Sequence, residues 1–496
     1  MLTLADVIEG TGGPRIPAWE NRTLREVVID SRQALRGDLF IALRGERADG
    51  HDFVTDAFNR GASAALVDRP VELLSGHTFI DVQHTEIKSD WAPVGDNTPV
   101  LIRVDNTLKA LQRLSGWWRR KIGALAPRLR VIGVTGSVGK TTTKEVIAQV
   151  LNIRYRTLKS EGNYNNEIGV PLTLLKLNAE HERAVIEMGM YQRGEIAAYC
   201  EWAQPHVGVV TMVAPVHLER LGTIENIQLA KAELVQALPS AAEGGVAVLN
   251  DDDERVRAMA GMTRARVVTY GLSPRADVWA EQIESRGLDG ITLTVHHGSQ
   301  SRRARAPLLG RHSAHTVLRA AAVGLVEEMN WDEIIEGLRQ SSAQLRLTVL
   351  EGPHRSLVID DTYNASEESA IAALNLLAEI GNGAAAGAGS GMVRIAVLGD
   401  MLELGDVEEQ AHRNVGCRAA TIARYVVCVG RRARWIAEEA VQCGADANCV
   451  YTCDTNAEAL RVLATLLRDR SVILVKGSRG MKMEEIVAGL TAGNAT

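Results

Sequence analysis

The segment "RLRVIGVTGSVGKTTTKEVIAQVL", residues 128–151, constrains the fold more than any other part of the chain. Its first part is an apolar run that predicts a β-strand. The part after the glycines predicts a helix, whose apolar face carries Val146, Ile147, Val150 and Leu151. The glycines therefore lie at a strand-to-helix turn, where backbone N–H groups and the helix N-terminus converge on an anion. Such a turn is typical of α/β proteins that bind phosphate groups.

The loop itself departs from the common phosphate-binding pattern G-x-x-x-x-G-K-[ST]. That pattern has glycine six residues before the lysine, but here Val134 has that position and the additional glycine, Gly136, is four before Lys140. We expect Lys140 to reach the β- and γ-phosphates of a nucleotide and the Thr141 hydroxyl to bind Mg²⁺. The predicted nucleotide-binding residues of the loop are Gly136, Ser137, Val138, Gly139, Lys140, Thr141 and Thr142. A tight turn with an incidental lysine is the alternative, and the loop alone is compatible with a kinase, a motor or a ligase.

Length and charge narrow the class of protein. A chain of 496 residues is too long for one hydrophobic core, so roughly two to four domains are expected. The net charge of −6 favours neither a nucleic acid nor a membrane surface as the main partner. The N-terminus lacks the basic and apolar regions of a signal peptide, and no run approaches the roughly 20 apolar residues of a membrane span. These features predict a cytoplasmic enzyme, which we expect to be a monomer.

The six cysteines are spread thinly, at positions 200, 417, 428, 443, 449 and 453. None forms a C-x-x-C pair, so the spacing indicates neither a zinc site nor a disulfide framework. We expect reduced thiols with a structural role.

The order of strand-like and helix-like segments predicts an α/β protein of three domains. Residues 1–105 mix short β-rich runs with loops, and the polar segment 74–100 is expected to be a surface excursion. Residues 106–340 alternate apolar strands with amphipathic segments, which indicates a mostly parallel sheet around the phosphate loop. Residues 341–496 repeat the pattern as a Rossmann-like unit, in which "GNGAAAGAGSG", residues 381–391, is expected to be a flexible loop.

Three polar residues of the central block follow or accompany predicted elements. Glu187 ends the strand-like "RAVIEMG", where a carboxylate close to a phosphate loop can bind Mg²⁺, and a surface glutamate is an equal alternative. His217 follows another strand, and a lone histidine is more often structural than a ligand. Lys231 lies in the helix-like "ENIQLAKAELVQAL", which on the residues alone favours a solvated lysine.

The third block places charged residues at strand ends. Asp360 and Asp361 end a strand in "VIDDTYNAS", where paired acids can bind metal, act as a base or cap a loop. Lys476 and Arg479 follow another strand in "LVKGSRG", and their positive charge suits an anionic substrate.

Several separate motifs resemble those of the Mur ligases, the ATP-dependent amide-forming enzymes of peptidoglycan synthesis. They are "TGSVGKTTTKE", whose glycine four residues before the lysine is a family feature, "GNYNNEIGVPLTLL", "EMGM", "APVHLERLGTIENIQLAKAEL", "DDTYNAS", "LGDMLELG" and "VKGSRGMKME". The N-terminal "DSRQALRGDLFIALRGERADGHDF" is similar to the family's uridine-nucleotide-binding pattern. The resemblance covers nearly the whole chain. It implies a UDP-substrate-binding domain, a central ATP-binding domain and a C-terminal ligase domain.

The resemblance also implies a reaction. "LGDMLELG" and "DDTYNAS" favour the member that joins D-alanyl-D-alanine to UDP-N-acetylmuramoyl-tripeptide, and the Asp-Asn-Pro-Arg motif of the tripeptide-forming relative is absent. The expected course is transfer of a phosphoryl group from ATP to the tripeptide carboxylate, followed by attack of the amine on the acyl phosphate. The sequence leaves open the third residue of the tripeptide and the general base.

Residue roles follow from the same resemblance. Lys140, Lys231, His217 and Glu187 are the implied catalytic residues. Thr141 and Glu187 would hold Mg²⁺ between the ATP phosphates, and His217 with a carbamylated Lys231 would form a second Mg²⁺ site. Carbamylation requires an uncharged amine, so the surroundings must lower the pKa of Lys231.

Nucleotide and substrate contacts are implied in all three blocks. Arg346 and Asp361 would contact ATP, and Ser31 and Arg32 would contact the uracil nucleotide. The remaining implied substrate-binding residues are Asn163, Asn166, Tyr363, Asn364, Lys476 and Arg479.

One segment departs from the family pattern. Where the family commonly has G-x-H-N-x-x-N, this chain has "GRHSAHT", in which Ser313 and Thr316 replace both asparagines and His312 remains. The adenine contacts of those amides are therefore in question.

Two other classes of protein remain as alternatives. One is a P-loop kinase or NTPase switch, which would not need the third block, and the other is a UDP-sugar-binding sensor with a vestigial loop.

Overall fold

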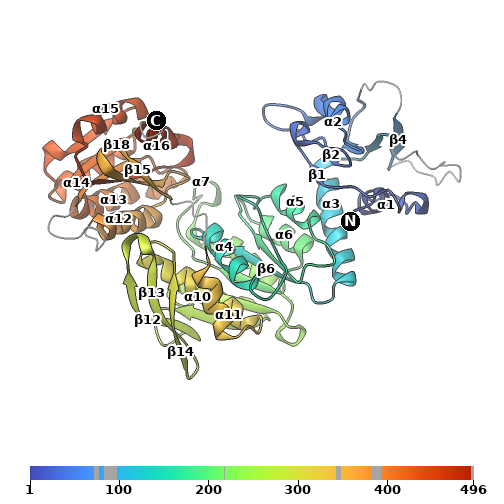
Figure 1. Cartoon of the computed structure of the whole chain (residues 1–496), viewed down its shortest axis with the longest axis horizontal. Coiled ribbons are helices and arrows are strands. Elements are labelled where there is room, and N and C mark those ends of the chain that lie inside the picture. Colours follow the sequence, from blue (N-terminus) through green and yellow to red (C-terminus); the bar gives the residue numbers. More distant parts are fainter. Residues whose placement is uncertain (72–76, 83–97, 217, 342–347, 382–391, 493–496) are drawn as a thin grey trace. The chain divides into compact units, whose positions relative to one another are not determined.

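The computed structural model describes residues 1–71, 77–82, 98–216, 218–341, 348–381 and 392–492. Two compact units emerge along the chain (Figure 1). The first comprises Met1–Gly133, Tyr155–Met190 and Glu195–His206, and the second comprises Val134–Arg154, Tyr191–Gly194 and Val207–Thr496.

The first unit begins with a small parallel sheet. Its helices and strands are α1 (Leu4–Gly10), β1 (Val27–Val28), β2 (Leu39–Ile41), α2 (Val54–Asn59), β3 (Ala64–Val67), β4 (Thr78–Asp81), β5 (Val100–Arg103), α3 (Thr107–Leu125), β6 (Arg130–Thr135), β7 (Thr157–Lys159), α5 (Gly169–Leu175), β8 (Arg183–Glu187) and α6 (Glu195–Ala203). The described strands β1 to β5 pair in parallel in the order β1-β2-β3-β5-β4. The long helix α3 starts where the Asn106 side chain accepts a hydrogen bond from the Lys109 N–H, and the buried Trp118 donates its indole N–H to the Leu177 carbonyl.

Strand β4 corrects one expectation from the sequence. Segment 74–100 was expected to be a surface excursion, but Thr78–Asp81 pairs with β5 at the edge of the sheet. Phe79 is half exposed there and Ile80 is buried, so the strand has only one apolar face toward the core. A four-residue edge strand within a polar segment carries too little periodicity to be recognised. Residues 72–76 and 83–97 lie outside the described part.

The second unit carries the phosphate loop and the C-terminal third of the chain. Its elements before residue 340 are α4 (Lys140–Leu151), β9 (Val207–Val210), α7 (Leu218–Leu221), α8 (Ile224–Gln236), β10 (Val246–Asn250), α9 (Glu254–Ala258), β11 (Arg266–Gly271), β12 (Val278–Ser285), β13 (Ile291–His297), β14 (Gln300–Ala306), α10 (Ala314–Val326) and α11 (Trp331–Arg339). Those after it are β15 (Thr348–Gly352), β16 (Ser356–Asp361), α12 (Glu367–Gly381), β17 (Val393–Gly399), α13 (Glu408–Ile422), β18 (Tyr425–Val429), α14 (Ala433–Gln442), β19 (Val450–Cys453), α15 (Asn456–Leu466), β20 (Ser471–Lys476) and α16 (Glu484–Thr491).

Strands β9 to β14 form a mixed sheet. β9, β10, β11 and β12 pair in parallel, as the mostly parallel pattern predicted, and β12, β13 and β14 add antiparallel pairs. The turn between β13 and β14 uses Gly298, whose φ of 57° suits a tight hairpin.

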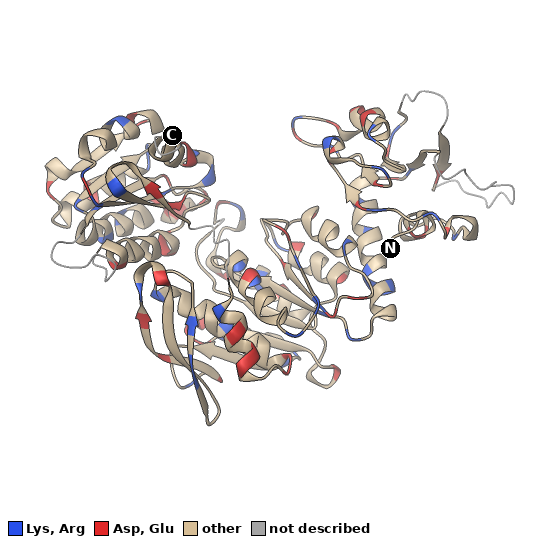
Figure 2. Cartoon of the chain, viewed as in Figure 1, with Lys and Arg blue, Asp and Glu red and all other residues tan. Residues whose placement is uncertain are grey.

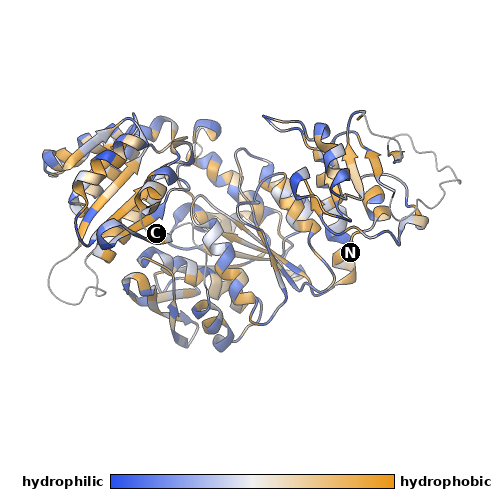
Figure 3. Cartoon of the chain, turned by 45° about the horizontal axis from the view of Figure 1, so that its top comes forward, coloured by the Kyte–Doolittle hydropathy of each residue, from blue (hydrophilic) through white to orange (hydrophobic). Residues whose placement is uncertain are grey.

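The C-terminal sheet is doubly wound, in the order β15-β16-β20-β17-β18-β19 within the described residues. Only β15 is antiparallel to its neighbour. Alternate strand residues face opposite sides: Ile359, Ala396 and Leu474 pack with α12, α13 and α14, while Val358, Val397 and Ile473 pack with α15 and α16. Figure 3 shows the resulting apolar strands between amphipathic helices. This confirms the predicted Rossmann-like arrangement.

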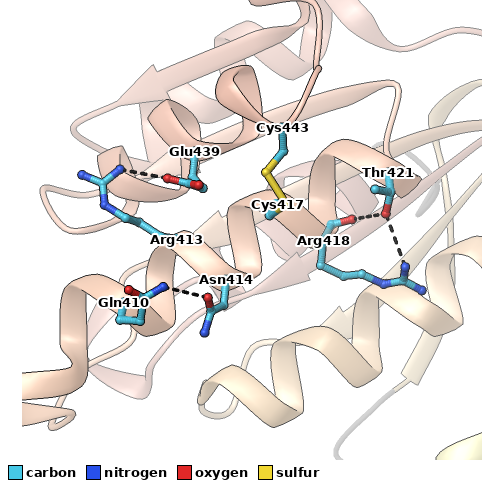
Figure 4. Close-up of a disulfide and its surroundings, with 8 residues drawn as sticks. All are labelled: Gln410, Arg413, Asn414, Cys417, Arg418, Thr421, Glu439 and Cys443. Carbon is cyan, nitrogen blue, oxygen red and sulfur yellow. Dashed lines mark hydrogen bonds and ion pairs between the residues drawn. A yellow bond between two sulfur atoms is a disulfide. The ribbon is translucent and has the colours of Figure 1, made fainter.

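A disulfide in this region corrects the expectation of reduced thiols. Cys417 of α13 and Cys443 at the end of α14 are bonded, with their Cα atoms 5.2 Å apart (Figure 4). Helices α13 and α14 approach closely at Gly416, where a Cβ would lie 2.4 Å from the Ile436 carbonyl oxygen. The pair is 26 residues apart without a spacing motif, so helix packing, which the cysteine pattern does not encode, decides the bond. The other four cysteines are buried and form no disulfide with another described residue.

The charged residues of both signs are interspersed over the described elements (Figure 2). None of the described helices has both the length and the apolar character needed to cross a membrane.

Candidate active site

The predicted phosphate loop forms as the sequence indicated. β6 ends at Thr135 and α4 begins at Lys140, after an N-cap glycine, Gly139, in the left-handed conformation with φ 84°. The Lys140 ammonium folds back across the loop and donates to the carbonyl oxygens of Gly136, at 2.7 Å, and Ser137, at 3.2 Å. The first backbone N–H groups of α4 and this ammonium therefore surround the same turn, as anion binding requires.

The structure explains why glycine occupies position 136. Its φ is 143°, and an added Cβ would lie 1.8 Å from the Thr211 hydroxyl oxygen, an impossible contact. Thr211 follows β9, and its hydroxyl donates to the Val138 carbonyl at 2.7 Å. The Ser137 hydroxyl donates to the Ala214 carbonyl and accepts from the Ala214 N–H. The glycine shifted in sequence is thus the point at which the loop passes directly over the segment after β9.

Helix α4 is held in place by its buried apolar face and by a close contact with α11. The predicted face of Val146, Ile147, Val150 and Leu151 is fully buried. An added Cβ at Gly337 of α11 would lie 2.6 Å from the Val150 Cα, so only glycine allows that approach. A rigid support of this kind holds the loop in place when an anion binds.

Lys231 is buried in α8 and does not lie on a solvated face. It is 2% exposed. Desolvation, and secondly the positive charge of Lys140, lower the pKa of the Lys231 ammonium well below its usual range. The solvated-lysine alternative is therefore excluded, and a neutral amine beside the phosphate loop is favoured.

Glu187 is equally buried, at the carboxyl end of β8 in the first unit. Its exposure is 0%, which excludes the surface-glutamate alternative. One carboxylate oxygen accepts from the Asn165 amide at 2.8 Å, and its backbone N–H donates to the Ser160 hydroxyl. Asn165 lies in the segment 163–167, which was expected to line the substrate region, but its contact with Glu187 was not predicted. Its neighbour Asn166 caps the start of α5, since its side-chain oxygen accepts from the Gly169 N–H at 2.9 Å.

The two acids at the end of β16 have different partners. Asp360 accepts from the backbone N–H and hydroxyl of Thr362, which closes a turn. Asp361 pairs in register with Lys476 of β20, whose ammonium donates to the Asp361 carboxylate at 2.7 Å and to the Asn364 carbonyl at 2.8 Å. Burial raises the pKa of Asp361, and the Lys476 ammonium opposes that shift.

An exposed cation lies beside this pair. The Arg479 guanidinium is 5.4 Å from the ring centroid of Tyr363 and also approaches its hydroxyl. The structure therefore brings together four predicted C-terminal residues, Asp361, Tyr363, Lys476 and Arg479, at the carboxyl ends of β16 and β20.

The N-terminal candidates lie in a short 3₁₀ turn after β1. Ser31 is buried and hydrogen-bonds the Asp56 carboxylate, which lowers the pKa of Asp56. Arg32 is exposed and forms a bidentate pair with Asp30. Its guanidinium is held at the surface rather than buried.

In the segment "GRHSAHT", which departs from the family pattern, the structure shows what the side chain of Ser313 contacts. The Ser313 hydroxyl donates to the Leu309 carbonyl at 2.7 Å, one turn earlier in the chain. The nearby His315 ring contacts the Asp252 carboxylate at 2.9 Å. Thr316 is buried at the start of α10.

Two predicted residues, His217 and Arg346, lie outside the described residues, as does most of segment 381–391. Among the described side chains, no group of three or more His, Cys, Asp or Glu is arranged to hold a metal.

Three family models match the chain in succession. They are described as "Mur ligase family, catalytic domain" over residues 23–118, "Mur ligase middle domain" over 134–324 and "Mur ligase, glutamate ligase domain" over 345–479.

Known proteins are similar to this chain over nearly its whole length. A Bacillus subtilis protein named UDP-N-acetylmuramoyl-tripeptide–D-alanyl-D-alanine ligase is 34% identical over 98% of this chain and 97% of its own. A crystal structure of MurF from Acinetobacter baumannii is 29% identical, with a TM-score of 0.79 and 98% of each chain covered. MurF from Thermotoga maritima in complex with ADP is 25% identical, with a TM-score of 0.72, over 95% of this chain and 98% of that one. These structures share the predicted three-domain α/β architecture, and the chain belongs to the Mur ligase family.

Proposed function

We propose that the protein is an ATP-dependent ligase that joins D-alanyl-D-alanine to UDP-N-acetylmuramoyl-tripeptide and so forms the pentapeptide precursor of peptidoglycan. Relatives with that name are 29–35% identical over at least 94% of this chain. The observation that carries the proposal is the buried Lys231, whose pKa is lowered by burial and by the charge of Lys140, beside a phosphate loop whose shifted Gly136 is required by Thr211. A general NTPase switch needs neither Lys231 nor the C-terminal sheet.

The first chemical step is transfer of the γ-phosphoryl group of ATP to the tripeptide carboxylate. A carboxylate oxygen forms the new bond to phosphorus, and the bond to the leaving ADP breaks. Two anions must approach each other, and Lys140 with the loop N–H groups from Gly136 to Thr142 offsets that repulsion. The ADP complex of the Thermotoga maritima relative supports nucleotide binding by this protein.

The second step forms the amide. The amine of D-alanyl-D-alanine attacks the acyl carbon, the amine loses a proton, and phosphate leaves with the electron pair of the broken C–O bond. Tyr363, Asn364, Lys476 and Arg479 offer hydrogen-bond donors and positive charge for the carboxylates of the peptides. Asn163 and Asn166 are assigned to the same substrate, and Ser31 and Arg32 to the uracil nucleotide.

The donor set fits magnesium by its chemistry. Mg²⁺ takes hard oxygen ligands, such as the Thr141 hydroxyl and the Glu187 carboxylate, and His217 with Lys231 would hold a second ion. When bound, the metal stabilises negative charge on the transferring phosphoryl group. Arg346 and Asp361 are assigned to ATP.

Carbamylation of Lys231 is part of the proposal. Reaction of the neutral amine with CO₂ forms an N–C bond and releases a proton, which converts the neutral nitrogen group into an anionic oxygen ligand. Full burial and the nearby charge of Lys140 favour the neutral amine that this reaction needs.

The proposal extends to organisation and location. The three domains are assigned to residues 1–105, 106–340 and 341–496, for the UDP-linked substrate, for ATP and for ligation respectively. We place the enzyme in the cytoplasm as a monomer, where UDP-linked precursors and ATP are its partners rather than nucleic acid.

One assay tests the function. Phosphate release from ATP is measured with UDP-N-acetylmuramoyl-tripeptide and either D-alanyl-D-alanine, meso-diaminopimelate or no amine. A further reaction contains the UDP-linked dipeptide precursor and meso-diaminopimelate. Release that requires both the tripeptide and D-alanyl-D-alanine is expected. Equal release without any amine would identify an NTPase instead, and release with diaminopimelate on the dipeptide precursor would identify the tripeptide-forming relative.

A further inference from the structure

A buried arginine of α10, Arg319, lies directly against the phosphate loop. It is 7% exposed in a helix whose other buried residues are apolar except for Thr316. One guanidinium nitrogen is 3.3 Å from the position that a Cβ would take at Gly139, and the same nitrogen donates to the Thr143 hydroxyl. The Thr143 N–H in turn donates to the Gly139 carbonyl at 3.0 Å. Arg319 therefore lies beside Gly139 at the start of the first turn of α4 and hydrogen-bonds Thr143 at its end.

An aromatic side chain fixes the other side of the guanidinium. The Tyr270 ring centroid is 5.6 Å from the Arg319 guanidinium carbon. The Tyr270 hydroxyl contacts the carbonyl oxygens of Val210 and Thr211 at 3.1 and 3.0 Å, which ties the ring to the segment that clamps the loop. Ring and guanidinium together hold a cation in a defined place.

The charge of Arg319 has no carboxylate partner in the part of the chain that the structure describes. Its Nε is buried without a hydrogen-bond partner. Burial lowers the pKa of the Arg319 guanidinium, and the interactions with Tyr270 oppose that shift. An arginine side chain nevertheless remains protonated at neutral pH. A buried charge without a counterion is costly, so the position is unfavourable in the free protein unless an anion arrives.

The loop beside it is where an anion binds. We infer that Arg319 is a positioning residue for the nucleotide. The phosphates bound in the loop supply the missing counter-charge, and the contacts with Gly139 and Thr143 hold the loop in its left-handed turn. This inference rests on the proposed function, because it requires that the loop binds ATP. Arg319 is thus an additional cation at the nucleotide site, and it belongs neither to the phosphate-loop pattern nor to the family motifs named above.

A purely structural arginine is the competing explanation. Such a residue would stabilise the free protein, and its removal would lower thermal stability without a specific effect on nucleotide affinity. A residue that awaits a counterion behaves in the opposite way: its neutral replacement leaves the free protein at least as stable and weakens nucleotide binding.

The test compares Arg319→Met, which keeps the length of the side chain and removes the charge, with Arg319→Lys, which keeps the charge. Arg119→Met is the matched control, since Arg119 is also a buried arginine, 4% exposed, but its Nε donates to the Ala203 carbonyl within the first unit. For each protein, the melting temperature without nucleotide, the dissociation constant of ADP, and KM for ATP and kcat are measured.

Arg319→Met is expected to melt no lower than the wild type and to raise both the ADP dissociation constant and KM for ATP about tenfold, with kcat changed by less than about threefold. Arg319→Lys is expected to restore most of the affinity, and Arg119→Met to leave KM unchanged. Wild-type affinity for ADP in Arg319→Met, or equal losses in Arg319→Lys and Arg319→Met, would overturn the inference. If the wild type itself binds no ADP or ATP, the proposed function fails, and this outcome is separate from a failure at Arg319 alone.

Discussion

At the scale of single residues, the proposed site depends on charged side chains that the fold buries. Lys231 and Glu187 both follow ordinary-looking segments of sequence, yet they are 2% and 0% exposed. A lysine in an amphipathic helix is usually solvated, and only the packed structure shows that α8 turns this one inward. Burial lowers the pKa of the Lys231 ammonium, and this favours the neutral amine that the proposed carbamylation needs.

Replacement of Lys231 tests this directly. Lys231→Ala is expected to lose at least about a hundredfold in kcat, because an oxygen ligand or charge near the transferring phosphoryl group is removed. Added short carboxylic acids are expected to restore part of the activity, since they can occupy the space of a carbamate. Steady-state ligation with and without acetate measures both effects. Full activity of Lys231→Ala without added acid would refute the carbamate.

His206 predicts a pH dependence of stability in the first unit. Burial, together with Arg130, Arg119 and Arg183, lowers its pKa to about 4, and its Nδ1 accepts a hydrogen bond from the Val131 N–H. In the unfolded chain histidine has a pKa of about 6.5, so the unfolded state binds more protons between these values. The stabilisation is therefore fully present above pH ~6.5 and is lost, by roughly 2–3 kcal/mol, as the pH falls toward 4.

Urea unfolding between pH 4 and 8 measures this effect. His206→Asn is the matched variant, because an amide oxygen can replace Nδ1 as the acceptor but does not titrate in this range. Its unfolding free energy is expected to fall less steeply with acid than that of the wild type. Identical pH profiles for the two proteins would show that His206 is not the group responsible.

At the scale of elements, the loop between β6 and α4 depends on one steric contact. Gly136→Ala places a methyl group on the Thr211 hydroxyl, so the loop or the segment after β9 must shift. Affinity for ADP is expected to fall more than about tenfold, because the phosphate cradle loses its geometry. Gly12→Ala is the control: its φ of 104° carries a similar backbone strain, but nothing lies within 4 Å of the added methyl. Calorimetry measures the affinity of both variants for ADP. Unchanged affinity in Gly136→Ala would show that the contact with Thr211 does not determine the conformation of the loop.

The disulfide between α13 and α14 makes a second prediction at this scale. It closes a loop of 26 residues, so its reduction is expected to lower the free energy of unfolding by about 3 kcal/mol. Ion pairs of Arg413 of α13 with Glu438 and Glu439 of α14 also join the two helices, and Figure 4 shows the pair with Glu439. Chemical unfolding with and without reductant measures the difference, and the Cys417→Ser/Cys443→Ser variant should not respond to reductant. If the midpoint of the wild type does not change on reduction, the bond does not contribute in solution.

At the scale of the whole molecule, the sequence predicted the fold class and the family because both depend on local patterns. Apolar runs followed by amphipathic segments specify β6, α4 and the doubly wound C-terminal sheet, and the comparisons confirm the three-domain α/β architecture. Edge strand β4 and the Cys417–Cys443 bond were not predicted, since each depends on partners that are distant along the chain. Arg319 was missed as well, although an arginine within "HTVLRAAAVGLV" was the available signal.

In the assigned site, too, residues in local motifs could be predicted, whereas contacts with residues distant along the chain could not. Motif residues such as Lys140 could be selected from spacing, and their loop forms as expected. The roles of His217, Arg346 and the substrate-binding residues stay predictions, as do the three domain boundaries. Asn165, which orients the Glu187 carboxylate, could not be separated from its neighbours in "NYNNE" until the fold placed it.

The central claim is ligation through an acyl phosphate, and an isotope measurement tests it most directly. UDP-N-acetylmuramoyl-tripeptide with ¹⁸O in its terminal carboxylate is incubated with the enzyme, ATP and D-alanyl-D-alanine, and the released phosphate is analysed by mass spectrometry. Because the attacking carboxylate oxygen stays on phosphorus when the amide forms, each ligation is predicted to release phosphate that carries one ¹⁸O. Phosphate without the label, released in step with the dipeptide-extended product, would contradict the account.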